Sequence, residues 1–396
     1  MFRKILPIFI VTALAQSNGL AESLRALPVD PSEITPERPA EVETEAEDSR
    51  EAVPLPAGSV KLPDLKPAKK TDAPKDISDL PTGEDAVRLQ IFLDQSNFGP
   101  GVIDGKPGRF TILAVQSWNE TRGNRPDDMR PVMADARREV SHVFARATVP
   151  KGATKWVNSS LSHSKAAQAK SKRMSYRSIA EFMAERYHTD VEFILELNGS
   201  KDTWRAKVGS SLIVPNVKPF LIENVSGKLF KEDPALSERH AVVDTKMNQV
   251  RIFEAAPAAL VIEEEGDLVS DQPVLVKPRA NQALVASFPI TPGKPQFIHY
   301  GVWTLKNSVE LPVWRYDQSL LTTGKRSNDY LNIPPGPNSP VGIIWNGLSK
   351  SGIGLHGTSD PETIGRARSA GCIRLANWDA IRIPTLIRPG ATVEVR

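Results

Sequence analysis

The hydrophobic positions of this chain follow a helical period first and a strand period later. Between residues 83 and 147, apolar side chains such as Leu89, Leu93 and Val115 recur at helical spacing on both sides of a glycine-rich turn at residues 101–105. This pattern predicts two helices joined by a turn, with these three side chains in the core. A further helix is expected towards the end of the region.

Two later regions have different patterns. Residues 150–216 show the spacing of two amphipathic helices, followed by a short β-branched strand at residues 212–215. After a connector at residues 217–239, the stretch 240–396 carries short apolar segments such as residues 249–253 that are separated by turn-rich sequence. Many short strands of this kind predict a β-rich, sandwich-like domain, so the chain is expected to be a multidomain α+β protein.

The beginning of the chain has two segments that precede these domains. Residues 1–21 open with a short basic stretch and continue with an apolar run at residues 5–15, which is the pattern of a secretory signal peptide. The run is too short to span a bilayer, so we expect an exported, periplasmic protein without stable membrane insertion after cleavage. Residues 22–82 are rich in proline and charge, and they predict a disordered linker.

Composition narrows the possible partners. The chain has 396 residues, a hydrophobic fraction of 40% and a formal net charge of +3. This length and hydrophobic fraction allow two or three domains with real cores, and no basic cluster with interleaved aromatics indicates nucleic-acid binding. Neither a metal nor another cofactor is expected. The histidines other than His356 lack the spacing of metal ligands: His142, His163, His188, His240 and His299.

The single cysteine, Cys372, is the main candidate for chemistry. In an exported chain it has no partner for an internal disulfide, so it is either a small buried hydrophobic residue or a reactive thiol. A thiol nucleophile needs a base or a positive charge beside it, and His356 lies 16 residues upstream (372 − 356 = 16). Gly371 leaves room for a carbonyl substrate, and Arg374 is placed to hold a carboxylate.

Several ordered sequence elements around this cysteine resemble a known family. The sequences at residues 356–358, 364–368 and 369–375, together with the earlier segment 338–342, are similar to the signature of the L,D-transpeptidase catalytic domain, also called the YkuD domain. The resemblance covers roughly the last 150 residues, a length that suits one domain. The resemblance therefore implies that the domain predicted at residues 240–396 is an L,D-transpeptidase catalytic domain.

The resemblance implies a reaction and a set of roles. In that family the cysteine attacks a peptidoglycan tetrapeptide stem at the bond that follows the L-centre of a diamino acid, D-alanine leaves, and an amine resolves the thioester. Carried over by position, Cys372 is the nucleophile and His356 the base. Four further residues would support the substrate or the oxyanion: Ser369, Gly371, Gly357 and Arg374. The chain departs from the family pattern at Ala370, where histidine is usual, so His356 must act alone.

The two helical regions also have resemblances. Residues 83–147 look like the small helical peptidoglycan-binding module, whose Asp-Gly turn joins two helices. Residues 150–216 resemble a LysM module, a βααβ unit that grips glycan N-acetyl groups, although the usual Gly-Asp-Thr-Leu opening is replaced by the sequence at residues 172–176. Both resemblances imply peptidoglycan as the partner.

Three hypotheses of function stay open. The first is a periplasmic L,D-transpeptidase that remodels the cell wall through a cysteine thioester. The second is a catalytically weak scaffold that binds peptidoglycan, which Ala370 favours. The third is a thiol-dependent L,D-carboxypeptidase, in which water resolves the acyl-enzyme. His299 is the alternative base within the domain, and Tyr300, Trp303, Trp314 and Tyr316 are candidates either for a lid over the thiol or for packing against the sheet.

Overall fold

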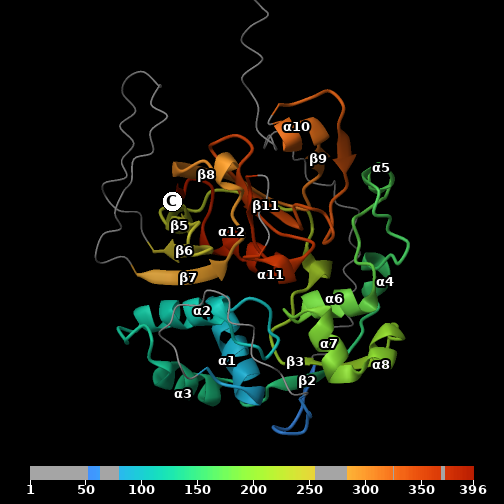
Figure 1. The fold of residues 1–396 in the computed structure, drawn as a ribbon, viewed down its shortest axis with the longest axis vertical. Coiled ribbons are helices and arrows are strands. Elements are labelled where there is room, and N and C mark those ends of the chain that lie inside the picture. The colour runs from blue at the N-terminus through green and yellow to red at the C-terminus, as the bar shows by residue number, and fades with distance from the viewer. Residues whose placement is uncertain (1–51, 63–79, 255–282, 324, 367–370) are drawn as a thin grey trace, which may run out of the picture.

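The molecule has a helical half, built mainly from residues 80–216, and a sheet half that follows it in the chain (Figure 1). The computed structural model describes residues 52–62, 80–254, 283–323, 325–366 and 371–396. The expected signal peptide and most of the expected linker lie outside the described residues.

The first part of the helical half confirms the predicted helices. Leu89, Leu93 and Val115 are fully buried, and Trp118 joins them in one apolar cluster. Burying each of these large side chains contributes on the order of 1.5–3 kcal/mol, which holds short helices that would be marginal alone. The helices are α1 (Gly83–Gln95), α2 (Arg109–Glu120) and α3 (Met129–Glu139).

The second part of the helical half places helices between two strands. Ser178 caps α6 by accepting a hydrogen bond from the Glu181 N–H at 3.0 Å, and Asp190 caps α7 by accepting from the Phe193 N–H at 2.7 Å. Strand β2 precedes residue 150, where this unit was expected to begin, and pairs antiparallel with β3. The elements are β2 (Phe144–Thr148), α4 (Ala153–Trp156), α5 (Lys165–Gln168), α6 (Ile179–Arg186), α7 (Val191–Asn198), α8 (Ser200–Trp204) and β3 (Ser211–Pro215).

A third strand of this small sheet comes from the region expected to be a disordered linker. Strand β1 (Val53–Pro54) pairs antiparallel with β2, and the Leu55 N–H donates to the Phe144 carbonyl at 2.8 Å. The expectation of disorder is therefore wrong for residues 52–62. A two-residue strand carries no hydrophobic period, and its order comes from the ladder that β2 offers it.

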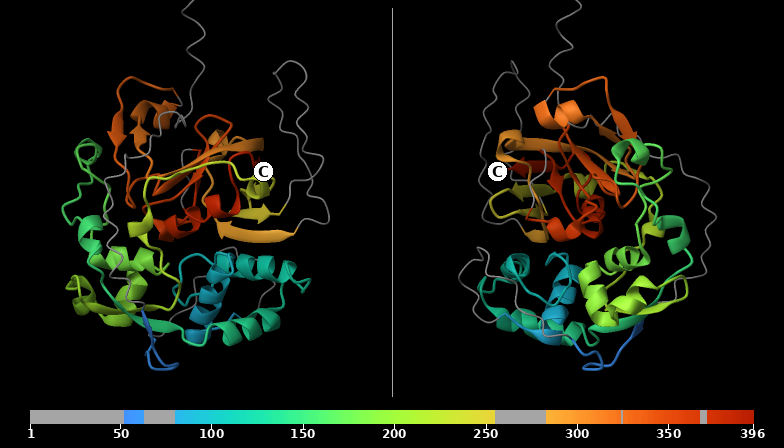
Figure 2. Two further views of the ribbon diagram at one scale, coloured as in Figure 1. Left: turned by 180° about the vertical axis from the view of Figure 1, so that it is seen from behind. Right: turned by 45° about the vertical axis from the view of Figure 1, so that its right-hand side comes forward.

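The sheet half confirms the expected β-rich domain, and most of its strands form one large curled sheet. Its strands run in the order β13-β12-β11-β8-β14-β5-β6-β7, and β4 also pairs with β8. Figures 1 and 2 show this sheet above the helical half. The strands are β4 (Leu229–Phe230), β5 (His240–Asp244), β6 (Gln249–Phe253), β7 (Leu284–Pro289), β8 (Gly301–Glu310), β11 (Ile344–Leu348), β12 (Gly354–His356), β13 (Ile373–Arg374) and β14 (Thr392–Val395).

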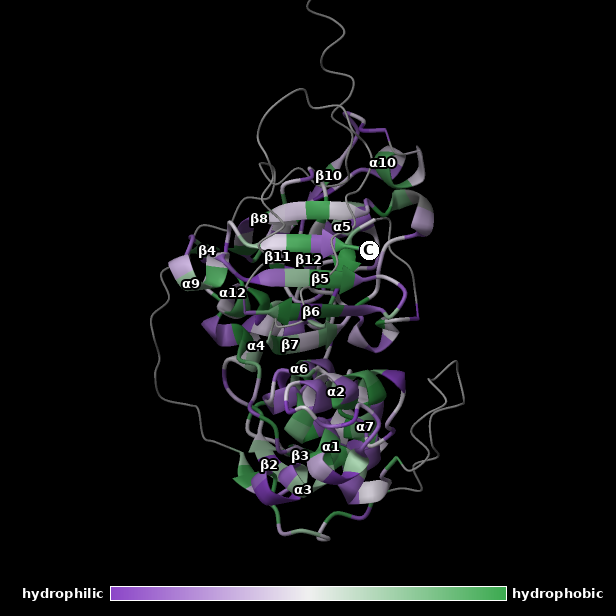
Figure 3. Ribbon diagram, turned by 90° about the vertical axis from the view of Figure 1, so that its left-hand side faces the viewer, coloured by the Kyte–Doolittle hydropathy of each residue, from purple (hydrophilic) through white to green (hydrophobic). Residues whose placement is uncertain are grey.

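The sheet curls around its own core. Side chains from β5, β12 and β14 pack in one buried cluster with Ile383 and Leu386 of helix α12 (Ile383–Leu386). The connector expected at residues 217–239 takes part in this half, because it supplies β4 and the short helix α9 (Pro234–Ser237). Figure 3 shows the strands stacked above the helical half, with β7 nearest to the helices.

The two halves meet along the edge strand β7. The Gly99 N–H donates to the Ser287 carbonyl at 2.7 Å, and the Ser287 N–H donates to the Asn97 carbonyl at 2.9 Å. A side chain at Gly99 would lie 2.9 Å from the Pro289 ring, so only glycine allows this approach. The turn after α1 therefore covers a sheet edge that would otherwise expose unpaired backbone groups.

A buried polar contact reinforces the joint. Asp94 at the end of α1 is fully buried, and one of its oxygens lies 2.8 Å from Arg382 Nη2 and 3.0 Å from His188 Nδ1. The His188 ring stacks on Trp378 of the sheet half, with 5.4 Å between the ring centroids. Within the described part of the chain, no helix is long and apolar enough to cross a membrane.

Candidate active site

Three of the sequence-predicted residues come together at one edge of the large sheet. Strands β12 and β13 are parallel, with Leu355 opposite Ile373 and His356 opposite Arg374. Side chains alternate along a strand, and partners in register point to the same face, so His356, Arg374 and Cys372 share one face. Through the register of this strand pair, Cys372 and His356 become spatial neighbours although they are 16 residues apart in the sequence.

Trp345 of β11 completes this face. It lies opposite His356 in the ladder, and the two rings stack with centroids 5.6 Å apart and planes 17° apart. A side chain at Gly354 would lie 2.8 Å from the Trp345 ring, so the indole covers the backbone at this glycine. Trp345 and Cys372 belong to one apolar cluster that also contains Trp314. Trp345 was not singled out in the sequence because its role depends on the register of β11.

The His356 ring has a defined protonation pattern. Its Nδ1 lies 2.6 Å from the Gly357 carbonyl oxygen, which only accepts hydrogen bonds, so Nδ1 carries the proton and Nε2 keeps its lone pair. The side chain is buried, and this burial, together with the Arg374 charge, lowers the pKa of His356 to about 3. A neutral imidazole with an available nitrogen can accept a proton at ordinary pH.

The Cys372 thiol is buried and protonated in this state. Its Sγ lies 3.6 Å from the Gly352 carbonyl oxygen, to which the S–H donates. Burial raises the pKa of Cys372 to about 11, although the Arg374 guanidinium and a backbone hydrogen bond from Gly354 oppose the shift. The thiolate must therefore be made when a reaction occurs, by a base that takes the proton.

The backbone of Arg374 is hydrogen-bonded to a neighbouring segment of the chain, but part of its side chain has no hydrogen-bond partner among the described residues. Its N–H and carbonyl form a bridge with Thr291, at 3.0 and 2.9 Å. Its Nε is buried without a hydrogen-bond partner among the described residues. A positive charge beside Cys372 with an open donor is suited to an anionic group of a ligand.

The glycines of the site allow close backbone packing. Gly371 has φ +120°, and a side chain at Gly293 would lie 2.5 Å from the Gly371 Cα. A side chain at Gly357 would lie 1.9 Å from Asn377 Oδ1. Asn377 is fully buried and was not predicted from the sequence, which offers no pattern that separates it from other polar residues. Ser369 and Ala370 lie outside the described residues, so their predicted roles stay predictions.

The alternative base lies near the same loop. The Phe297 carbonyl oxygen would lie 3.1 Å from a side chain at Gly371, and His299 follows two residues later. His299 is half-buried and its carbonyl accepts a hydrogen bond from Trp303 Nε1 at 3.2 Å. It is therefore the natural comparison for any test of His356.

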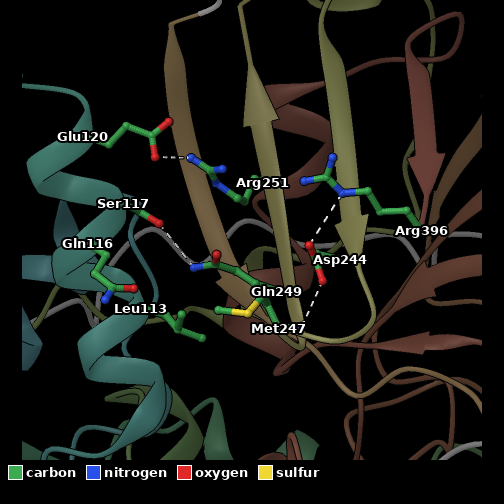
Figure 4. A pocket seen from close by; sticks show the side chains of 9 residues that line it. All are labelled: Leu113, Gln116, Ser117, Glu120, Asp244, Met247, Gln249, Arg251 and Arg396. Carbon is green, nitrogen blue, oxygen red and sulfur yellow. Dashed lines mark hydrogen bonds and ion pairs between the residues drawn. The ribbon is translucent and has the colours of Figure 1, made fainter. Parts of the chain in front are cut away.

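A separate cavity lies between the two halves (Figure 4). It has a volume of about 140 Å³ and is lined by α2 on one side and by β5 and β6 on the other. Two ion pairs border it, Arg251 with Glu120 and Arg396 with Asp244. Cys372, His356 and Arg374 are not among its lining residues, so we assign it to the joint between the halves. Within the described residues, no cluster of three or more His, Cys, Asp or Glu could hold a metal ion.

Comparison with known proteins identifies the class of the sheet half. The family described as L,D-transpeptidase catalytic domain, YkuD, matches residues 269–395. The YkuD protein of Bacillus licheniformis is 40% identical over 65 residues, which are 16% of this chain and 39% of that protein. The YqjB protein of Bacillus subtilis is 31% identical over 138 residues, which are 33% of this chain and 73% of that protein. The chain belongs to the L,D-transpeptidase family.

The extent of these similarities is limited. The chain spans about 40% of the length of the YkuD relatives that it matches. Among solved structures, L,D-transpeptidase 3 from Mycobacterium tuberculosis in complex with a faropenem-derived adduct is similar at 16% identity, with 40% of this chain and 60% of that chain covered and a TM-score of 0.27. Bd1075 of Bdellovibrio bacteriovorus is similar at 16% identity, with 43% and 52% covered and a TM-score of 0.25.

Proposed function

We propose that this protein is an exported L,D-transpeptidase that acts on peptidoglycan tetrapeptide stems through a thioester on Cys372. One observation carries the proposal: the parallel register of β12 and β13 puts Cys372, His356 and Arg374 on one face of the sheet. The family assignment gives this arrangement its reaction class. The pattern at residues 1–21 supports export to the periplasm.

In the first half-reaction the Cys372 sulfur attacks the carbonyl carbon of the amide bond between the L-centre of the diamino acid and D-alanine. His356 Nε2 takes the thiol proton as the C–S bond forms. When the tetrahedral intermediate collapses, the C–N bond breaks and His356 returns the proton to the leaving amine. D-alanine departs and the tripeptide stays bound as a thioester.

In the second half-reaction an acceptor amine attacks the thioester carbonyl. Its surplus proton passes through His356 to the departing sulfur, which restores the thiol. Arg374 holds a carboxylate of the stem, and the backbone around Gly371 approaches the reacting carbonyl closely because no side chain intervenes. Ser369 and Gly357 complete the support of the loop.

The helical half supplies contact with the polymer. Its three-helix part, α1 to α3, supports the peptidoglycan-binding resemblance, and the strands β2 and β3 that flank α6 and α7 support the LysM-like one. We propose that both bring the catalytic edge to the wall.

The direct test is mass spectrometry of products after the mature protein meets a purified disaccharide-tetrapeptide. We expect a cross-linked dimer with loss of D-alanine, and no product from a Cys372→Ala variant whose folding is checked by circular dichroism. Full activity of Cys372→Ala would contradict the thioester route. Thiol-dependent tripeptide without dimer would indicate the carboxypeptidase, and no product from the folded wild type would favour the scaffold.

A further inference from the structure

Helix α6 of the helical half makes a buried contact with the sheet half. Glu185 is 5% exposed, and the Asn377 Nδ2 donates to both of its carboxylate oxygens, at 3.1 and 3.0 Å. The Tyr176 hydroxyl donates to the same carboxylate at 2.7 Å. Burial raises the pKa of Glu185 to about 8, although the hydrogen bonds from Tyr176 and Asn377 oppose the shift. Among the described residues, the hydrogen bonds to this carboxyl group come from Tyr176 and Asn377.

The other end of the Asn377 amide lies against two loops of the site. Its Oδ1 accepts a hydrogen bond from the Ile343 N–H at 3.2 Å. A side chain at Gly357 would lie 1.9 Å from this oxygen, and a side chain at Gly342 would lie 2.2 Å from it. The amide therefore fills the space between the loop before β11 and the loop after β12. Its orientation is fixed by its partners, since Nδ2 faces acceptors and Oδ1 faces a donor.

Gly357 links this amide to the imidazole. Its carbonyl oxygen accepts the hydrogen bond from His356 Nδ1 at 2.6 Å, which selects the tautomer with a lone pair on Nε2. A shift of the Gly357 peptide would rotate or release the ring. Small displacements of a catalytic group, of about 1 Å, cost roughly 100-fold in rate.

We propose that Glu185 is a positioning residue for His356, acting through Asn377 and the Gly357 peptide; this rests on the proposed role of His356 as the base. The helical half is then part of the catalytic apparatus as well as a tether. Glu185 touches neither substrate nor thiol, so its removal affects the chemical step and leaves substrate binding unchanged.

The test uses the full-length protein and the Glu185→Leu variant. This change removes both Glu185 acceptors of Asn377 Nδ2 and leaves the Pro337 carbonyl, at 3.3 Å, as the remaining acceptor. The readout is the rate at which iodoacetamide alkylates Cys372, followed by intact mass over a range of pH. In this reaction the sulfur displaces iodide and its proton is lost to His356 or to solvent. We expect Glu185→Leu to lose roughly 10- to 100-fold in rate near neutral pH, and its profile to approach that of His356→Gln. Glu185→Gln, which keeps one acceptor, restores most of the rate.

Asp94→Asn is the matched control. It weakens a different buried contact between the halves, Asp94 with Arg382, without touching Asn377 or Gly357. We expect it to lower the melting temperature and to leave the alkylation profile unchanged. A Glu185→Leu protein that melts like the control and alkylates like the wild type would overturn the proposal.

Two further measurements test the proposal where Glu185→Leu does not fold or where a stem substrate is turned over. If Glu185→Leu does not fold, Asn377→Asp takes its place, because it keeps the size and the Oδ1 acceptor but loses the Nδ2 donor; a wild-type alkylation profile in that variant would also overturn the proposal. If a stem substrate is turned over, we expect Glu185→Leu to lower kcat with KM unchanged. Since alkylation needs no stem peptide, a wild type that is inactive on peptidoglycan would contradict the proposed function and still leave the positioning role measurable.

Discussion

Burial displaces the two titrating groups of the site in opposite directions. It lowers the pKa of His356 to about 3 and raises the pKa of Cys372 to about 11, because a low-dielectric environment disfavours either charged form. The resting pair is therefore a neutral imidazole and a neutral thiol, rather than an imidazolium and a thiolate. A mechanism built on this pair transfers the proton during attack on the carbonyl.

This pairing predicts the pH dependence of acylation and the identity of the base. His356 is neutral above a pH of about 3 and the thiol is protonated below about 11, so general-base acylation should be nearly independent of pH between about 5 and 9. A preformed thiolate would instead give a rate that rises tenfold per pH unit.

His356→Ala should lower the acylation rate by roughly 100- to 10,000-fold, measured by single-turnover mass spectrometry.

His299→Ala is the control for this assignment. We expect its rate to stay within a few-fold of the wild type, because the register of β12 with β13 places His356 on the face of Cys372. The reverse result, a silent His356→Ala and an inactive His299→Ala, would transfer the role of base to His299.

At the scale of elements, helix α2 of the helical half supports the loop that runs from His356 towards Cys372. The Gly365 N–H donates to Thr291 Oγ1 at 2.7 Å, and a side chain at Gly365 would lie 2.3 Å from the ring of Phe110 in α2. Gly365 also has φ +77°, a conformation that other residues adopt at a cost. The helix and the loop therefore fit only while residue 365 has no side chain.

This contact predicts the outcome of a double-mutant cycle. Gly365→Ala should destabilise the protein by roughly 2–5 kcal/mol, from overpacking against Phe110 and from the positive φ. Adding Phe110→Ala should relieve the overpacking, so the double variant should be more stable than the sum of the two single changes predicts. Urea unfolding of the four proteins measures this coupling, and strictly additive changes would contradict the contact.

Some elements could be predicted from the sequence and others could not. Helical spacing predicted α1, α2, α6 and α7, because each buries a regular apolar stripe. It did not predict β1, whose order comes from its partner strand, nor that nine described strands of the sheet half join in one large sheet. The YkuD-like signature led to the catalytic domain and to residues that the register brings together. Trp345, Asn377 and Glu185 could not be found this way, since only tertiary contacts distinguish them.

At the scale of the whole molecule, the two halves share buried carboxyl groups whose pKa values are shifted in both directions. Burial would raise the pKa of Asp94, but the charges of Arg382 and His188 overcome this and lower it. Glu185 and Asp379 are different, because burial raises the pKa of each to about 8. Stability should therefore depend on pH through this joint, with separate contributions on the acid side and near neutrality.

The contribution near neutrality has a definite sign. Glu185 and Asp379 have ordinary pKa values of 4.5 and 3.8, and in the folded state these rise to about 8. Between these limits the folded protein holds protons that the unfolded chain has lost, so stability falls as pH rises from about 5 to about 8 and levels off above it. The Asp94 contribution has the opposite sign and is lost only in strong acid, as pH falls through its lowered pKa.

Melting temperatures of the full-length protein across this pH range test the prediction. Asp379→Asn removes one of the two titrating groups and lies outside the Glu185 contact with Asn377, so the decline between about pH 5 and 8 should become shallower in this variant. Because Asn cannot ionise, its melting temperature should exceed that of the wild type most at the alkaline end. A wild-type melting temperature that rises over this interval, or an Asp379→Asn curve parallel to the wild type, would show that these carboxyl groups do not hold their protons in the folded joint.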